Sequence, residues 1–392
     1  MLEVRAGLLN RLVRKFWKTM GRVQLHSADM KLQVCLKKIK IGTRWEQAHH
    51  LIITRIFDKH GLGSVSGTKT LIKKIKKLNP DIIHLHQIHG YYVNIELLFG
   101  FLAKYGKPVI WTLHDCWAYT GHCCHYVRVG CKKWETGCFS CPLKGYYPQS
   151  LYIDNSKENY VLKKQLFTSI PYLTLVPVSN WLATELSRSF LKGKNIHPIH
   201  NAIDVEKFIY SDPSKLIQKH NLEGKKIILG VASPWSAIKG LNDFYTLSKM
   251  MDDHYKIILI GLTENQIKDL PSNIIGLARL DDPSDLVRYY SLADVFINPS
   301  IAESFGLVTI EAMACGTPVV GYNVTATPEL IPKGTGYVVE RGDVKGLFEK
   351  VKLILEKGKI YYSEACRNNV VVHYNKDYQY DKYLALYQQK LN

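Results

Sequence analysis

The chain of 392 residues, 46% of them hydrophobic and 22% charged, is long enough for two domains, each with its own core. Its formal net charge of +18 indicates an anionic partner, and charge alone leaves nucleic acid, anionic lipid and a phosphorylated substrate open. The sequence has neither a run of eighteen apolar residues nor a secretory signal, which excludes a membrane-spanning helix and predicts a cytoplasmic protein.

The first forty residues are strongly basic, with ten Lys or Arg side chains against only Glu3 and Asp29. Apolar residues recur at helical spacing over residues 6–20, which predicts an amphipathic helix. Such a helix either lies in an anionic membrane interface or packs on its own domain. The first alternative, slightly favoured here, would make the protein peripheral on the inner face of the plasma membrane.

Short apolar runs alternate with helical segments along the rest of the chain, which is typical of an α/β protein. One group of runs ends before residue 190 and a second group begins after residue 208, so a boundary is expected near 190–205. We therefore predict domains at 1–195 and 196–375, followed by a helix within 376–392 that returns to the first domain. The predicted strands are 80–87, 107–115, 173–180, 225–233, 255–262, 273–280, 292–300 and 317–323.

Histidines follow the first two predicted strands. His114 closes strand 107–115, at the carboxyl edge where open α/β sheets bind ligands, so a functional role is favoured over a structural one. His86, His89 and Asn94 lie after strand 80–87 and are weaker candidates for an acceptor site. The stretch HLHQIH does not predict a metal site, because no Asp or Glu near it completes a convincing ligand set.

Six of the nine cysteines lie between Cys116 and Cys141, and four of them have the spacing C-x7-C-x6-C-x2-C. In a cytosolic protein such a cluster binds zinc more often than it forms disulfides. Four thiolates would close a structural zinc site and order a long loop, whereas the alternative is a set of free thiols. The predicted ligands are Cys123, Cys131, Cys138 and Cys141, with Cys124 and His122 as alternatives.

Residues 299–332 contain two carboxylates, Glu303 and Glu311, around a Phe-Gly-Leu sequence. A buried strand ends near residue 299, and the apolar spacing from Leu307 onward predicts a helix. Free amides near Gly306 would then favour a phosphate at the helix start, and the two carboxylates could bind hydroxyl groups. A second loop at 325–329 is predicted at the same sheet edge. Solvated helix-start glutamates are the alternative, but a sugar joined to a nucleoside diphosphate fits the whole segment better.

Residues 291–332 closely resemble the donor-binding segment of retaining glycosyltransferases of the glycogen-synthase-like group, which have the two-domain GT-B fold. The resemblance implies two Rossmann-like domains that face a cleft. It also implies that Glu303 contacts the transferred sugar near the reacting carbon, and that Glu311 holds the ribose hydroxyls. The neighbouring donor-binding residues implied are Ser304, Phe305, Gly306 and Leu307.

Outside that segment, the resemblance implies that Lys239 meets the donor diphosphate and that His114 faces the transferred sugar. Three features depart from the family pattern. No arginine precedes Lys239 in residues 230–238, and Ala202 replaces the glycine of the interdomain turn. The usual N-terminal strand with its glycine-rich turn is not apparent, so an incomplete first domain is expected.

The implied function is transfer of a sugar from a nucleoside-diphosphate donor to a glycan or lipid-linked acceptor, with retention, in surface polysaccharide synthesis. Catalysis would need no metal, because helix amides and Lys239 stabilise the leaving diphosphate. A catalytically silent GT-B-like binding protein is the main alternative. A nucleic-acid-binding protein is disfavoured because it leaves the two glutamates unexplained. A dinucleotide-dependent oxidoreductase is disfavoured because no G-x-G-x-x-G follows a predicted strand.

Overall fold

The computed structural model describes residues 2–5 and 41–392. The amphipathic helix predicted at 6–20 lies outside these residues. The chain divides into two compact units. The first comprises Met1–Ile199 and Tyr380–Asn392, and the second comprises His200–Gln379. Within the described ranges, no helix is both long enough and apolar enough to cross a membrane.

The first unit is built on a five-stranded sheet in the order β1-β2-β3-β4-β5. β2 to β5 are parallel, and the side chains of β3 and β4 are buried throughout, as expected of strands that helices cover on both faces. The strands are β1 (Leu2–Arg5), β2 (Ile82–His86), β3 (Val109–Leu113), β4 (Leu173–Pro177) and β5 (Asn195–Ile196).

β1 occupies a position where the sequence predicts no strand. It runs antiparallel to β2, with Leu2 opposite Leu85 and Arg5 opposite Ile82. A βαβ unit requires two parallel strands joined by a crossover, so β1 does not begin such a unit. The Rossmann-like part of the first unit therefore consists of the four parallel strands β2 to β5.

Helices connect the strands of the first unit. Thr43 and Glu46 form a reciprocal capping box at the start of α2, which satisfies two of the amide groups exposed there. Between β3 and α5, residues 114–155 form a long connection whose only regular elements are three short 3-10 turns. The elements are α2 (Arg44–Phe57), α3 (Val65–Leu78), α4 (Ile95–Tyr105), η1 (Trp117–Tyr119), η2 (Tyr126–Val129), η3 (Lys133–Glu135), α5 (Ser156–Thr168) and α6 (Asn180–Arg188).

The second unit contains a parallel six-stranded sheet in the order β11-β10-β9-β6-β7-β8. In chain order this is the doubly wound 3-2-1-4-5-6 arrangement, and β6 and β9 flank its switch point, where ligands of such sheets bind. The sequence did not predict β11 or the short β5. The strands are β6 (Lys226–Val231), β7 (Tyr255–Ile260), β8 (Ile274–Leu277), β9 (Val295–Asn298), β10 (Val319–Tyr322) and β11 (Gly336–Val339).

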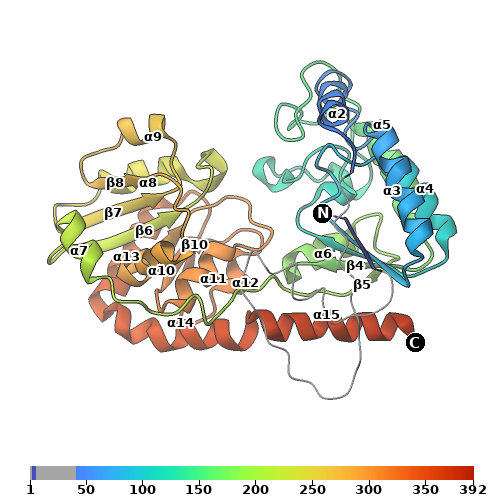
Figure 1. The fold of residues 1–392 in the computed structure, drawn as a ribbon. Coiled ribbons are helices and arrows are strands. Elements are labelled where there is room, and N and C mark those ends of the chain that lie inside the picture. The colour runs from blue at the N-terminus through green and yellow to red at the C-terminus, as the bar shows by residue number, and fades with distance from the viewer. Residues whose placement is uncertain (1, 6–40) are drawn as a thin grey trace. The chain divides into compact units, whose positions relative to one another are not determined.

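Helices and one 3-10 turn join the strands of the second unit, and two long helices precede the C-terminal helix (Figure 1). They are α7 (Ser214–His220), η4 (Ala237–Lys239), α8 (Leu241–Ser248), α9 (Glu264–Lys268), α10 (Pro283–Leu292), α11 (Leu307–Ala314), α12 (Thr327–Leu330), α13 (Val344–Lys357) and α14 (Lys359–His373).

The C-terminal helix α15 (Lys376–Leu391) contributes most of its length to the first unit, to which Tyr380–Asn392 belongs. Leu386 and Tyr387 pack in a cluster with buried residues of β2, β3 and β4. The Tyr387 hydroxyl also lies 2.6 Å from Nδ1 of buried His84. The end of the chain therefore completes the core under the first sheet.

Candidate functional site

The loop after β9 and the start of α11 place the glutamate segment at the carboxyl end of the second sheet. Gly306 is the N-cap of α11 and has a φ of 106°, in the left-handed region that favours glycine. A Cβ at this position would also lie 3.2 Å from a methyl carbon of Leu330. Gly306 therefore permits the sharp turn at which α11 begins.

The switch point of the sheet brings Lys239 and Glu303 together. Lys239 ends the turn η4 after β6, and Glu303 lies in the loop after β9. The two loops are joined by a hydrogen bond from the Ile301 amide to the Ile238 carbonyl, at 2.9 Å. Lys239 Nζ lies 2.5 Å from Glu303 Oε1, and the side chains are 34% and 12% exposed. A cation and a carboxylate thus reach the same solvent-accessible point of the sheet edge.

The loop after β10 supports Glu303 from the other side. The Glu303 amide donates to Thr325 Oγ1 at 2.9 Å, and the Ala326 amide donates to the Glu303 carbonyl at 3.2 Å. The predicted second loop at this sheet edge is therefore in direct contact with the glutamate loop. The sequence places Thr325 in that loop but does not indicate its contact with Glu303.

Glu311 lies on α11, in a region of dense packing. Tyr290 OH donates to Glu311 Oε2 at 2.9 Å, and Lys207 is a nearby cation. Although Glu311 is partly exposed, burial of its carboxyl group raises the pKa from 4.5 to about 7, against the opposing effects of Tyr290 and Lys207. The carboxylate is thus held in surroundings that disfavour its charge, and hydroxyl donors of a ligand would relieve that cost.

The neighbouring donor-binding candidates differ in how far their side chains are buried. Phe305 is 3% exposed, and its ring packs 5.6 Å from that of Tyr374, between ring centroids. Ser304 is also buried, and its Oγ makes no hydrogen bond within the described part of the chain. Leu307 is half-buried at the first position of α11. For Phe305, the backbone is therefore the part that a ligand could contact, while its side chain belongs to the core.

His114 and His86 lie side by side at the carboxyl end of the first sheet. Nε2 of His114 is 3.3 Å from Nδ1 of His86, and the rings stack with centroids 5.6 Å apart. Burial lowers the pKa of His114 to about 4, against the opposing charge of Asp115. His114 is therefore neutral at physiological pH and can exchange hydrogen bonds with a hydroxyl group.

His89 forms an ion pair with Asp115, with 2.8 Å between Nε2 and Oδ2. Burial alone would raise the pKa of Asp115, but His89 and the Trp117 amide lower it well below its usual range. Together with Cys124, these two residues form a buried group whose potential ligand atoms lie within 4.8 Å of one another. This carboxylate partner of His89 is not apparent in the sequence, because Asp115 follows a different strand.

Asn94 has a structural role. Its side chain caps α4, because Oδ1 accepts a hydrogen bond from the Leu97 amide at 3.0 Å. Its Nδ2 group donates to the Leu62 carbonyl at 2.7 Å, and the residue is 4% exposed. With both side-chain groups engaged inside the protein, Asn94 is better explained as a helix cap than as the predicted acceptor contact.

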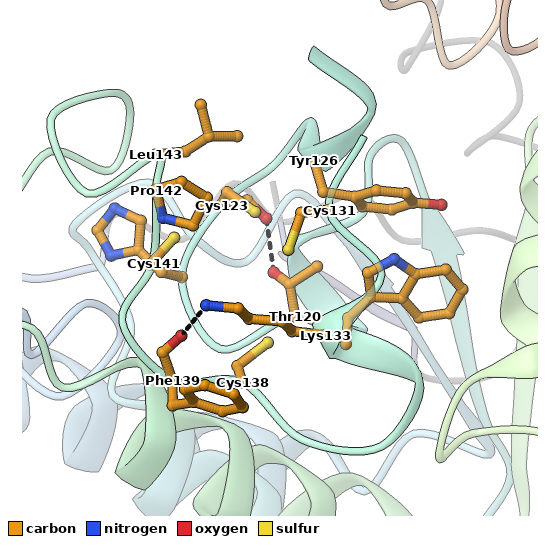
Figure 2. A pocket seen from close by; sticks show the side chains of 12 residues that line it. Thr120, Cys123, Tyr126, Cys131, Lys133, Cys138, Phe139, Cys141, Pro142 and Leu143 are labelled. Carbon is orange, nitrogen blue, oxygen red and sulfur yellow. Dashed lines mark hydrogen bonds between the residues drawn. The ribbon is translucent and has the colours of Figure 1, made fainter. Parts of the chain in front are cut away.

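The four cysteines predicted to bind zinc line a single pocket in the connection between β3 and α5. Figure 2 shows the sulfur atoms of Cys123, Cys131, Cys138 and Cys141 around the same space. All four are free thiols. The fold thus gathers residues that are spread over nineteen positions of the sequence, and none of them belongs to the sheet edges that carry the glutamates or His114.

Two protein-family models match the two units separately. Residues 212–370 match the family described as Glycosyl transferases group 1. Residues 41–207 match the family described as Glycosyltransferase Family 4. Both models describe glycosyltransferases, and together they extend over most of the chain. The chain thus contains a group 1 glycosyltransferase domain and a glycosyltransferase family 4 domain.

The glycosyltransferase is similar to a putative colanic acid biosynthesis glycosyl transferase, WcaC, of Escherichia coli, with 26% identity over 80% of this chain and 77% of the relative. It is 28% identical to a Campylobacter jejuni N,N'-diacetylbacillosaminyl-diphospho-undecaprenol alpha-1,3-N-acetylgalactosaminyltransferase over 46% of this chain and 49% of the relative. The crystal structure of Anabaena Alr3699/HepE in complex with UDP-glucose matches with a TM-score of 0.59 and 17% identity, covering 82% of each chain. This structural likeness supports the predicted GT-B fold of the glycosyltransferase.

Proposed function

We propose that the protein transfers a sugar from a nucleoside-diphosphate donor to a glycan or lipid-linked acceptor during surface polysaccharide synthesis. The observation that carries this proposal is the convergence of Lys239, Glu303 and the α11 amides at the switch point of the second sheet. The similarity to a colanic acid enzyme and to an undecaprenol-linked sugar transferase supports the acceptor class. The fold shared with a UDP-glucose complex supports the donor class.

Different groups of the protein would bind the diphosphate, the sugar and the ribose of the donor. The amides near Gly306 and the ammonium group of Lys239 would bind the diphosphate, because both favour negative charge. Lys239 would then exchange its contact with Glu303 for one with phosphate, and the released Glu303 carboxylate would accept hydrogen bonds from the sugar. Glu311 would accept those of the ribose. The diphosphate contacts follow from charge, whereas the sugar role of Glu303 and the ribose role of Glu311 rest on the resemblance to retaining glycosyltransferases.

We infer a reaction with retention of anomeric configuration. The bond between the anomeric carbon and the phosphate oxygen breaks as the acceptor hydroxyl forms its bond on the same face of the sugar. The proton of that hydroxyl passes to the departing phosphate, whose charge is stabilised by Lys239 and the helix amides. His114, neutral because burial lowers its pKa, would contact the sugar as a hydrogen-bonding group. No step requires a metal ion.

A screen of the full-length protein against UDP-, GDP- and ADP-sugars tests the donor site directly. We expect a thermal shift with one nucleotide class that is lost in Glu311→Ala. Release of the nucleoside diphosphate in the presence of a lipid-linked acceptor, and the anomeric configuration of the product by NMR, then test transfer and retention. Binding without turnover over a set of acceptors would instead favour the silent binding protein. Loss of all donor binding would refute the assignment of the site.

A further inference from the structure

The connection from β3 to α5 is ordered although it contains little regular secondary structure. Residues 114–155 include only three single-turn 3-10 elements, and loops of this length without regular structure are uncommon in compact domains. Cys116 begins the connection with an amide hydrogen bond to the Cys124 carbonyl, at 3.0 Å. A metal crosslink is one of the few devices that can hold such a segment in one conformation.

We propose that Cys123, Cys131, Cys138 and Cys141 bind a structural zinc ion that fixes this connection. Their sulfur atoms surround one pocket of the first unit, and none is in a disulfide (Figure 2). Zinc favours four thiolates in a closed tetrahedral site. On binding, the four thiols release their protons to solvent and the sulfur atoms become the ligands.

The backbone around two of the sulfurs is already arranged for thiolate ligands. The Gly121 amide donates to Cys138 Sγ at 3.2 Å, and the Leu143 amide hydrogen-bonds to Cys141. A Cβ on Gly121 would lie only 2.6 Å from the Cys138 Cβ, so this close approach requires glycine. Ser140, between the two cysteines, has a φ of 43°, which turns the chain tightly. Amide donors to sulfur are the outer contacts that stabilise metal-bound thiolates.

A third sulfur, that of Cys123, lies near one of these two. The thiols of Cys123 and Cys141 are close enough to interact electrostatically, although eighteen positions separate them in the chain. Among residues 2–5 and 41–392, no three of the four sulfurs lie within 4.8 Å of one another. Binding therefore requires the cysteine side chains to rotate inward, and a change of χ1 rotamer moves a sulfur by up to about 3 Å.

Buried charge next to the pocket favours an anionic centre. Lys163 is 2% exposed, and its ammonium group donates to the carbonyls of Trp117 and Thr120 at 2.9 and 3.0 Å. In the described part of the chain, no carboxylate forms an ion pair with it. Zinc bound to four thiolates carries a net negative charge, and Cys123 and Cys138 are close enough to act on Lys163 electrostatically. The metal centre would add negative charge beside this buried lysine, on which Asp58, itself paired with His122, also acts.

His122 is a neighbour of the proposed centre. Its Nδ1 is paired with Asp58 at 2.5 Å, with both side chains fully buried. Among residues 2–5 and 41–392, its Nε2 makes no hydrogen bond of good geometry, although the Tyr146 carbonyl is near. A histidine fixed by a carboxylate is a common metal-ligand arrangement, so His122 is the competing fourth ligand that an experiment must separate from Cys131.

The first test is the metal content of the full-length protein purified without chelators. We expect one zinc ion per chain after exhaustive dialysis, and nine titratable thiols after denaturation, the number of cysteines in the sequence. Cobalt exchanged for zinc should give the intense visible absorption of tetrahedral cobalt with thiolate ligands. A zinc-free protein with nine free thiols would overturn the proposal, as would a reduced thiol count that shows disulfides.

Matched variants then test the ligand set. Cys138→Ser and Cys131→Ser should lose the zinc, while Cys366→Ser, a buried cysteine of the second unit, and His122→Ala should keep it. Zinc retained in Cys131→Ser but lost in His122→Ala would overturn the assignment of four cysteines. If the serine variants do not fold, the cobalt spectrum of the unaltered protein still distinguishes four thiolates from three thiolates and an imidazole.

Discussion

Replacing Glu311 with Gln should stabilise the second unit at pH 8 while weakening donor binding. Burial raises the pKa of Glu311 from 4.5 to about 7, so at pH 8 the folded protein holds a charge that its surroundings disfavour. Gln is neutral and nearly the same shape, and its oxygen can still accept the hydrogen bond from Tyr290 OH, which spans 2.9 Å in the unaltered protein. The substitution therefore removes the charge and keeps the packing.

The magnitude follows from the two pKa values. A tenfold difference in proton affinity is worth about 1.4 kcal/mol, so ionised Glu311 costs up to about 3 kcal/mol at pH 8. Because the folded pKa lies above the unfolded value, this cost is fully present above pH 7 and disappears as the pH falls toward 4.5. The advantage of the Gln variant should shrink to less than about 1 kcal/mol at pH 5.

Calorimetric unfolding of the full chain at pH 5, 6, 7 and 8 measures this effect as a shift in the transition of the second unit. One kcal/mol corresponds to about 2–4 °C for a unit of this size, so a shift of about 6–12 °C is the upper bound at pH 8. Glu356→Gln, an exposed residue of α13, makes the same change in charge and serves as the control. Donor binding should change in the opposite direction, with loss of the nucleotide-sugar thermal shift.

Two results would refute this reasoning. An equal stabilisation by Glu311→Gln at pH 5 and pH 8 would show that ionisation of the carboxyl group is not the cause. Unchanged donor affinity in the variant would show that Glu311 does not hold the nucleotide. The two outcomes are separable, because the first concerns the protein alone and the second requires ligand.

Four further results are expected. Lys239→Ala should weaken donor binding about 10- to 100-fold by titration calorimetry, as for a lost charged hydrogen bond, whereas Lys226→Ala, at the opposite end of β6, should not. His114→Gln should lower turnover without removing any inflection from the pH–rate profile between pH 5 and 8, since burial lowers the pKa of His114 to about 4; a lost inflection would contradict its neutral state. The first unit should lose stability as the pH falls from 6.5 toward 4, because burial also lowers the pKa of His50 to about 4 and the unfolded chain binds the proton first. In calorimetry, His50→Gln should reduce this dependence of stability on pH. Tyr387→Phe should destabilise the first unit by about 1–2 kcal/mol in denaturant unfolding, because it leaves His84 without its 2.6 Å partner; an unchanged midpoint would show that the contact is unimportant.

Local patterns were sufficient to predict the strands that form most of both sheets. Each predicted run from 80–87 to 317–323 contains a strand of the structure, because short apolar runs between helical segments have few other ways to be buried. β5, with two residues, and β11, with half-buried side chains, give weaker signals and were missed. β1 was missed because it forms through pairing with β2, a contact that its own four residues do not indicate.

The prediction of the donor-binding segment used the same kind of local signal. The segment 299–332 contains its two glutamates, its glycine and its second loop within one short stretch, so local spacing was informative. For Asn94 the sequence pattern was ambiguous, because a helix cap and a ligand contact use the same polar side chain. The partner of His89 was missed because Asp115 follows another strand, and only the parallel pairing of β2 with β3 brings them together.

The sequence by itself therefore determined the α/β class, the segment predicted to bind the donor and the resemblance to glycosyltransferases, because these depend on periodicity and short-range spacing. Only the tertiary structure decided that Lys239 meets Glu303, a contact across 64 positions that exists because β6 lies next to β9 in the sheet. It also decided the raised pKa of Glu311, which depends on atoms packed around the carboxyl group from other parts of the chain. Contacts and burial between distant segments arise from strand order, and no local pattern in the sequence specifies that order.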